Sequence, residues 1–205
     1  MSGSPIEWTD FQKATIGRPP RELLRRTLGC FDIEKTPPGI AIDLGCGSGA
    51  DTIELLRRGW EVHAIDSQPG SLELLTKTIS PELGQKLHFH AQRFEDFIFP
   101  ECSLIWSSYS LPFCLSANWP TLWQRAIQSL TVGGRIAGDL FGPKHAFAIE
   151  PDILILTEEE VRKAMATLVV EAFDIEDGHR PSGGEITRWH AFGFAARKPK
   201  PESAV

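Results

Sequence analysis

The chain has 205 residues, of which 41% are hydrophobic, and this is enough for one well-buried α/β domain but too little for two. Its formal net charge of -6 at pH 7 argues against a partner that is bound mainly through phosphates, so we expect no nucleic-acid substrate. Residues 1–9 lack the pattern of a signal peptide and no apolar run is long enough to span a membrane, so we expect a cytoplasmic monomer or homodimer with no membrane partner.

The four cysteines are widely spaced along the chain. They are Cys30, Cys46, Cys102 and Cys114. This spacing matches neither a C-x-x-C motif nor the density of a disulfide framework. We therefore expect no disulfide bond and no bound metal.

Residues 1–36 form a segment in front of the first predicted strand. After the GRPP string at residues 17–20, leucines recur on one face of a predicted helix, which Gly29 would end. The segment either covers one side of the core or forms a lid over a cofactor cleft. In the second case, Arg18 lies near the carboxylate of the cofactor.

The stretch at residues 40–66 predicts one β-turn-α-β unit. A short apolar run ends in Asp43, a glycine-rich turn and an amphipathic helix follow, and a second apolar run ends in Asp66. The glycines of the turn are Gly45, Gly47 and Gly49. Glycines at alternate positions tolerate positive φ and let the backbone approach a bound molecule, and the helix N-terminus behind them favours an anionic or polar ligand. An acid about 20 residues beyond the first glycine can accept both hydroxyls of a ribose, so the unit predicts a nucleoside-bearing cofactor.

Two classes of cofactor fit this unit. Gly45, Gly47 and Ala50 satisfy the dinucleotide pattern G-x-G-x-x-G/A, which an acid follows at the right distance. However, Asp43 places a carboxylate at the mouth of the turn, where it would repel a pyrophosphate and attract the ammonium of S-adenosylmethionine. We favour S-adenosylmethionine, with S-adenosylhomocysteine as product, and keep a nicotinamide dinucleotide as the alternative.

The third strand leads into a second candidate contact with the cofactor. A helix that runs to about Ser80, where Pro81 stops it, precedes this strand at residues 87–91. In a doubly wound sheet the loop after such a strand lies over the ligand crevice. Here Phe94 can pack against the adenine, and an acid can accept a hydrogen bond from its exocyclic amine. The sequence leaves open whether that acid is Glu95 or Asp96.

The fourth and fifth strands lead into the expected acceptor side. Residues 102–106 form the fourth strand, and an aromatic and proline-containing segment at 107–113 follows it. A helix at 119–130 then places its tryptophans in the core. The fifth strand, at 135–141, ends in a loop with His145, which could act as a base or bind substrate.

The end of the chain decides between the two cofactor classes. Thr157 and Glu160 predict a capping box at the start of a helix. Two strand-like runs, at 168–175 and 187–197, are joined by a polar loop and form a hairpin. Because a complete dinucleotide-binding half would need another helical crossover, the hairpin disfavours that cofactor. We predict an α/β domain with a doubly wound, mostly parallel seven-stranded sheet and an antiparallel terminal hairpin, over residues 37–198.

Several strings in the chain are similar to those of a known family. They are GRPPRELLRRTL at 17–28, IDLGCGSGADTIELLRRGWEVHAID at 42–66, SLPFC at 110–114, GDLFG at 138–142 and RWHAFGFAARKP at 188–199. The chain resembles the class I S-adenosylmethionine-dependent methyltransferases, and among them the small bacterial, TehB-like tellurite-resistance group. The resemblance implies a Rossmann-like fold and the cofactor, but it does not fix the acceptor.

The resemblance also implies a role for each part of the site. It places Asp43 and the glycine turn around the methionine part of the cofactor, Asp66 at the ribose and the 94–96 loop at the adenine, and it places Tyr109 at the transferred methyl group. The full set of expected cofactor-binding residues is Arg18, Asp43, Gly45, Cys46, Gly47, Gly49, Asp66, Ser67, Phe94, Glu95 and Asp96.

We therefore predict methyl transfer to a small-molecule acceptor, such as a thiol or an oxyanion, by an in-line displacement that depends mainly on proximity. Tyr109 and His145 are the expected catalytic residues, and the expected substrate contacts are Phe113, Trp189 and His190. Members of the group tend to have an acid where this chain has the Pro-Lys-His stretch that ends at His145. The alternative functions are a nicotinamide-dependent oxidoreductase and a non-catalytic protein that binds S-adenosylmethionine.

Overall fold

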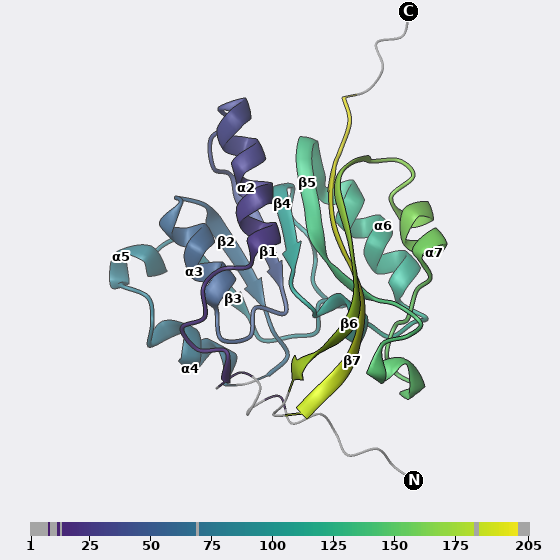
Figure 1. Ribbon diagram of the computed structural model, residues 1–205. Helices are drawn as coiled ribbons and strands as arrows, with labels where there is room; N and C mark the ends of the chain where they lie inside the picture. The colour runs from purple at the N-terminus through teal and green to yellow at the C-terminus, as the bar shows by residue number, and fades with distance from the viewer. Residues whose placement is uncertain (1–7, 9–11, 13, 69, 183–184, 201–205) are drawn as a thin grey trace, which may run out of the picture.

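The computed structural model describes Trp8, Gln12 and residues 14–68, 70–182 and 185–200. The described strands form one seven-stranded sheet in the order β3-β2-β1-β4-β5-β7-β6 (Figure 1). They are β1 (Ile40–Leu44), β2 (Glu61–Ile65), β3 (Leu87–His90), β4 (Cys102–Ser107), β5 (Leu130–Phe141), β6 (Val169–Ser182) and β7 (Glu185–Arg197). The first five strands are parallel, whereas β7 runs antiparallel to both β5 and β6. This confirms the predicted doubly wound, mostly parallel sheet with an antiparallel terminal hairpin.

Helices cover both faces of the sheet (Figure 1). They are α2 (Glu22–Glu34), α3 (Ala50–Arg57), α4 (Ser71–Thr76), α5 (Pro81–Gly84), α6 (Trp119–Ser129) and α7 (Glu158–Ala164), with short 3₁₀ turns η1 (Leu111–Phe113) and η2 (Ala146–Ile149). One apolar cluster joins the sheet to α2 and α3, and a second joins its other face to α6 and α7. The tryptophans of α6 are buried in the second cluster, as predicted, and the capping box of α7 has both of its hydrogen bonds.

Two predicted helix ends are wrong, and packing explains the first. The helix α2 passes through Gly29 and ends at Glu34, before Lys35 with φ 55°. The added residues bury Phe31 against Trp60, with ring centroids 5.1 Å apart, so burial outweighs the helix-breaking tendency of Gly29. Similarly, Pro81 does not stop a helix but begins α5, since proline is well accommodated at the first position of a helix.

The terminal hairpin is longer than predicted and extends past the rest of the sheet (Figure 1). β7 pairs with β5 only over residues 191–197, whereas it pairs with β6 over its whole described length. Residues 185–190 therefore stand beyond the carboxyl end of β5, together with their partners at 177–182. This extension carries Trp189 and His190 toward the end of the sheet where ligands bind in doubly wound folds.

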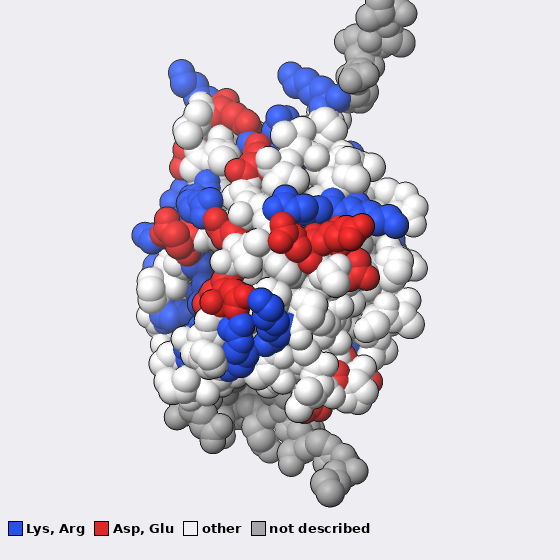
Figure 2. All heavy atoms as spheres, turned by 45° about the vertical axis from the view of Figure 1, so that its right-hand side comes forward, with Lys and Arg blue, Asp and Glu red and all other residues white. Residues whose placement is uncertain are grey.

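The surface offers two observations about partners. On the face shown in Figure 2, acidic and basic side chains lie close to one another, and that face offers no broad basic surface for a polyanion. In the part of the chain that the structure describes, every helix is too short or too polar to cross a lipid bilayer.

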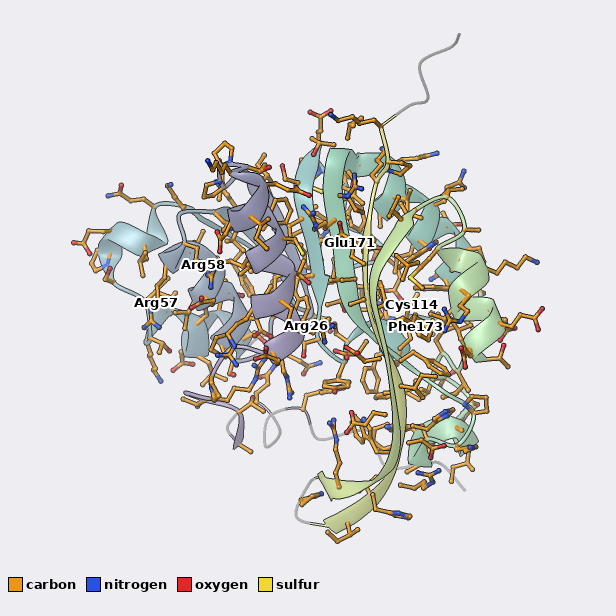
Figure 3. All side chains as sticks on the ribbon, turned by 45° about the horizontal axis from the view of Figure 1, so that its top comes forward. Arg26, Arg57, Arg58, Cys114, Glu171 and Phe173 are labelled. Atoms are coloured by element: carbon orange, nitrogen blue, oxygen red, sulfur yellow. The ribbon has the colours of Figure 1, made fainter. Side chains whose placement is uncertain are left out.

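A buried arginine ties α2 to the hairpin. The guanidinium of Arg135, on β5, donates to Glu34 of α2 at 2.6 and 3.0 Å and to Glu171 of β6 at 2.7 and 3.0 Å. Its side chain is 1% exposed, and its Cζ atom lies 4.5 Å from the ring centroid of Phe31. Arg26 of α2 adds a further pair with Asp174 of β6 at 2.7 Å; Figure 3 labels Arg26 and Glu171. These pairs hold the helix over the antiparallel half of the sheet.

We expect Arg135→Gln to lower the free energy of unfolding by about 2 kcal/mol, because it removes the charged hydrogen bonds by which this buried side chain holds Glu34 and Glu171. Lys77→Gln is the control: Lys77 pairs with Glu73 at 2.7 Å, but both side chains are well exposed, so the loss should stay below about 0.5 kcal/mol. Urea denaturation of both variants measures the difference, and equal losses would contradict the role given to Arg135.

Candidate functional site

A cavity of about 410 Å³ lies at the carboxyl ends of the parallel strands. Much of its lining comes from the segments that follow β1, β2, β3 and β4. Among the residues expected to bind a cofactor or an acceptor, those that line it are Gly45, Gly47, Asp66, Ser67, Phe94, Glu95, Tyr109 and Phe113. The crevice outside the carboxyl ends of the strands is where ligands bind in doubly wound sheets. The structure therefore brings residues from distant parts of the chain to one candidate site.

The turn after β1 has left-handed backbone at three glycines. Gly45, Gly47 and Gly49 have φ angles of 75°, 54° and 85°. A Cβ atom would clash with the side chain of Ser110 at Gly45 and with that of Leu75 at Gly49, whereas at Gly47 it would meet no atom within 4 Å. Gly45 and Gly49 are therefore required for packing, while Gly47 presents bare backbone to the cavity.

Asp66 is fixed at the edge of the cavity by backbone donors. The N–H of Gly47 donates to its Oδ2 atom and the N–H of Gln68 to its Oδ1 atom, each at 2.8 Å. Since each carboxylate oxygen has a second lone pair, both can still accept a hydrogen bond from a ligand. Asp66 can therefore hold a diol such as that of a ribose.

Asp43 lies behind the turn rather than in the cavity lining. It is 2% exposed, and its Oδ2 atom accepts a hydrogen bond from Thr52 at 2.5 Å. Burial, together with the neighbouring charge of Asp51, raises the pKa of Asp43 to about 7. The backbone of the turn therefore lies between Asp43 and the cavity. The expected interaction of Asp43 with the cofactor ammonium stays a prediction.

The N-terminal segment is fixed to the turn through Asp51 of α3. Arg18 donates to both carboxylate oxygens of Asp51, at 2.6 and 3.1 Å, and Trp106 of β4 donates to it at 3.1 Å. Arg18 is therefore already paired and lies outside the cavity lining. Two residues further toward the N-terminus do line the cavity: Trp8, whose ring lies 4.5 Å from that of Phe113, and Gln12, which donates to Ser71 at 2.8 Å.

The loop after β3 distinguishes the two candidate acids. Glu95 lines the cavity, and its Oε1 atom accepts hydrogen bonds from Arg93 at 2.6 Å and from the N–H of Leu115 at 3.2 Å. Its Oε2 atom is buried and has no hydrogen-bond partner among the described residues. Asp96 is exposed and lies outside the lining, so the geometry favours Glu95 as the acceptor for an exocyclic amine.

Tyr109 lies between this cavity and a second one. Its φ of 52° is unusual for a non-glycine residue and turns the chain sharply after β4. The ring is flanked by the guanidinium groups of Arg21 and Arg180, whose Cζ atoms lie 5.0 and 4.8 Å from its centroid. Burial raises the pKa of Tyr109 to about 12, so the phenol stays neutral at physiological pH and cannot act there as a base.

The second cavity, of about 370 Å³, holds a carboxyl group that sequence reasoning missed. Asp139 of β5 lines it together with Arg21, Tyr109 and Glu176. Burial raises the pKa of Asp139 to about 7, while Arg21 and the backbone N–H of Tyr109 lower it. The group can therefore take up or release a proton near neutral pH. An acid within the otherwise apolar run at 136–141 was the available signal.

His145, Trp189 and His190 line neither cavity. The ring of His145 stacks on Phe141 at 3.7 Å, its Nδ1 atom accepts a hydrogen bond from the N–H of Phe147 at 3.1 Å, and burial lowers its pKa to about 4. His190 accepts from the N–H of Lys144 at 3.2 Å. Trp189 lies under Arg180, and its ring centroid is 5.2 Å from that of Tyr109. Trp189 and His145 therefore pack together behind Tyr109, at 4.5 Å between ring centroids, whereas His190 fixes the loop after β5.

Cys46 and Gly49 also lie outside the cavity lining. The Cys46 thiol is buried, and burial raises its pKa well above the ordinary value, so the sulfur stays protonated. Its backbone N–H donates to the carbonyl oxygen of Ile65 at 3.1 Å. The contribution of Cys46 is therefore to the shape of the turn.

Residues 41–134 match a protein family described as a methyltransferase domain. The matched segment runs from β1 into β5 and contains the glycine turn, Asp66, Glu95 and Tyr109. A stretch of 55 residues is 40% identical to the magnesium-protoporphyrin O-methyltransferase of Rhodobacter capsulatus; it makes up 27% of this chain and 25% of that enzyme. The chain thus spans about a quarter of the length of this curated relative.

Solved structures share the fold. TehB from Haemophilus influenzae superposes with a TM-score of 0.69 and 17% identity, over 85% of this chain and 62% of that one. The 1,6-didemethyltoxoflavin-N1-methyltransferase of Burkholderia thailandensis, solved with 1,6-didemethyltoxoflavin and S-adenosylhomocysteine, gives 0.66 and 18% identity, over 94% of this chain and 84% of that one. At these identities the likeness concerns the fold.

Replacing glycines of the turn by alanine should lower the stability of the protein by different amounts. Gly49→Ala should lower the free energy of unfolding by about 2 kcal/mol or more, because it combines left-handed strain with the clash against Leu75. Gly47→Ala should cost only about 1 kcal/mol, since strain acts there alone. Gly178, without positive φ or nearby atoms, is the control, and Gly178→Ala should cost nothing. Chemical denaturation ranks the three, and a Gly47→Ala loss as large as that of Gly49→Ala would refute the assignment.

Asp43 predicts a pH dependence of stability. Its pKa is about 7 in the folded chain, against about 4 for an unfolded aspartate, so between these values the folded state binds the extra proton. The free energy of unfolding therefore falls as the pH rises from about 4 to 7. Without added cofactor, Asp43→Asn should gain stability relative to wild type over this range, whereas the exposed control Asp96→Asn should follow wild type. A difference between Asp43→Asn and wild type that is constant with pH would show that Asp43 does not titrate there.

Proposed function

We propose that the chain transfers a methyl group from S-adenosylmethionine to a small-molecule acceptor, because residues 41–134 match a methyltransferase-domain family and the chain has the class I methyltransferase fold. The observation that carries the proposal is the composition of one cavity. Bare backbone at Gly47, the fixed carboxylate of Asp66 and the aromatic side chains of Tyr109 and Phe113 all line it.

We assign the donor to the part of this cavity at the carboxyl ends of β1, β2 and β3. Asp66 accepts the ribose hydroxyls, and Glu95 receives the adenine amine beside the ring of Phe94. The methionine part lies along the glycine turn, with Ser67 close to the ribose. A cofactor ammonium above the turn would favour the ionised form of Asp43, which burial alone disfavours.

The same features make a nicotinamide dinucleotide a poor fit. A dinucleotide would place its pyrophosphate against the start of α3. Asp43 and Asp51 are both buried behind the turn at that point, and their carboxylates would repel it. The hairpin β6–β7 stands where a complete dinucleotide-binding half would need another parallel strand and its crossover helix. Both points support a sulfonium donor over a dinucleotide.

We assign the acceptor to the side of the cavity at Tyr109 and Phe113, close to the second cavity. Methyl transfer from a sulfonium is an in-line displacement with a good leaving group, so holding donor and acceptor in place can supply about 7 to 11 kcal/mol of the barrier. A thiolate or an oxyanion needs no base. For an acceptor that carries a proton, we assign its removal to Asp139, which lines the second cavity beside Tyr109, so this role requires an acceptor that extends past Tyr109 into that cavity.

Binding of the donor tests the proposal. Isothermal titration of S-adenosylmethionine into the purified chain should give one site. Asp66→Ala should weaken the affinity at least tenfold, because hydrogen bonds to a charged group contribute about 1.5 to 3 kcal/mol. Asp96→Ala is the matched control: its side chain is exposed and lies outside the lining, so the affinity should stay at the wild-type value.

Two outcomes would overturn parts of the proposal. Absence of binding to S-adenosylmethionine, or tighter binding of a nicotinamide dinucleotide, would exclude the donor. A screen of thiols, oxyanions and small amines, read as formation of S-adenosylhomocysteine, tests the transfer itself. Intact binding with no turnover across that screen would favour a non-catalytic protein that binds the cofactor.

A further inference from the structure

Three histidines and a glutamate lie on one face of β2 and β3, at the edge of the sheet. β3 is the outermost strand, and its parallel pairing with β2 places His63 beside His88 and Ile65 beside His90. Because side chains alternate along a strand, Glu61 and His63 share this face with His88 and His90. The cysteine pattern had led us to expect no metal, and these histidines are separated by up to 27 residues in the sequence.

No helix covers this part of the face. The chain between His90 and Cys102 is described throughout and has no helix, and α6 and α7 pack over the other half of the sheet. The cluster is therefore open to solvent: the side chain of His88 is 45% exposed and that of Glu61 48%. An ion can reach these side chains without any rearrangement of the backbone.

The four side chains already contact one another. His88 Nε2 lies 2.9 Å from Glu61 Oε1, and His63 Nδ1 lies 3.0 Å from His90 Nε2. Each of Glu61, His63 and His88 offers one ligand atom, and these atoms lie within 4.8 Å of one another. Ligands of a tetrahedral zinc ion are about 3.4 Å apart, so small rotations of exposed side chains are enough to close the site.

We propose that Glu61, His63 and His88 bind a divalent transition-metal ion of the zinc class. Two imidazoles and one carboxylate form a ligand set that suits zinc rather than magnesium or calcium, which prefer oxygen ligands alone. His90 is a positioning residue: its hydrogen bond holds one nitrogen of His63 and leaves the other for the ion. A water molecule completes the four ligands.

The bound ion would link the edge strand to the sheet. β3 has four residues and pairs only with β2 among the described strands. An ion held by Glu61 and His63 of β2 and by His88 of β3 would add a second connection between these two strands. The carbonyl oxygen of His90 also accepts a hydrogen bond from the backbone N–H of Asp66 at 3.2 Å. The cluster therefore lies next to the candidate donor site. We therefore expect the ion to raise thermal stability.

The test uses the full chain without an affinity tag, stripped of metal with a chelator and titrated with zinc chloride. We expect one ion per chain and a thermal midpoint that rises with zinc concentration. His63→Asn and His88→Asn should each weaken the affinity at least tenfold. His179→Asn, at an exposed histidine on β6, should bind zinc as the wild type does.

A second readout shows that the variants are folded. His88 is exposed and does not line the cavity, so His88→Asn should keep the far-UV circular dichroism spectrum and the S-adenosylmethionine affinity of the wild type. The zinc titration does not depend on methyl transfer, so its result stands whatever the fate of the proposed function. The proposal is overturned if the wild type binds no zinc, or if His63→Asn and His88→Asn bind it as tightly as His179→Asn.

Discussion

The proposed donor side of this protein depends on one backbone contact between two strand ends. The N–H groups of Gly45 and Cys46 both donate to the carbonyl oxygen of Ile65, at 2.8 and 3.1 Å, and so hold the turn after β1 against the end of β2. This contact brings Gly47 within hydrogen-bond distance of Asp66. It requires left-handed backbone at alternate positions, which glycine adopts without steric cost. The cavity, the fixed acid and the start of α3 all follow from that turn.

Features with a local cause could be predicted from the sequence. The glycine turn, the capping box at Thr157 and the terminal hairpin each depend on residues within a few positions of one another or on a short alternating pattern. These features were enough to predict the strand types and the cofactor class. The glycine turn also placed Asp66 at the carboxyl end of a strand, while Tyr109 was expected from the resemblance to class I methyltransferases, and both residues line the cavity.

Features that depend on packing between distant segments could not be predicted. Gly29 does not end its helix because Phe31 gains a buried contact with Trp60, which no local rule contains. His145 is a loop residue in the sequence, but in the structure it stacks on Phe141 behind Tyr109. Asp139 and the histidines of β2 and β3 acquire their neighbours only through strand pairing, so their chemistry became visible with the register.

The extension of the terminal hairpin is structurally separate from the parallel strands that carry the glycine turn. Residues 185–189 pair with β6 and not with β5, so they lie apart from the five parallel strands that shape the glycine turn. Yet this extension reaches Tyr109 through Trp189 and Arg180. Substitutions in this extension would therefore change the surroundings of Tyr109, on the proposed acceptor side, without a direct contact to Asp66 or to the glycine turn.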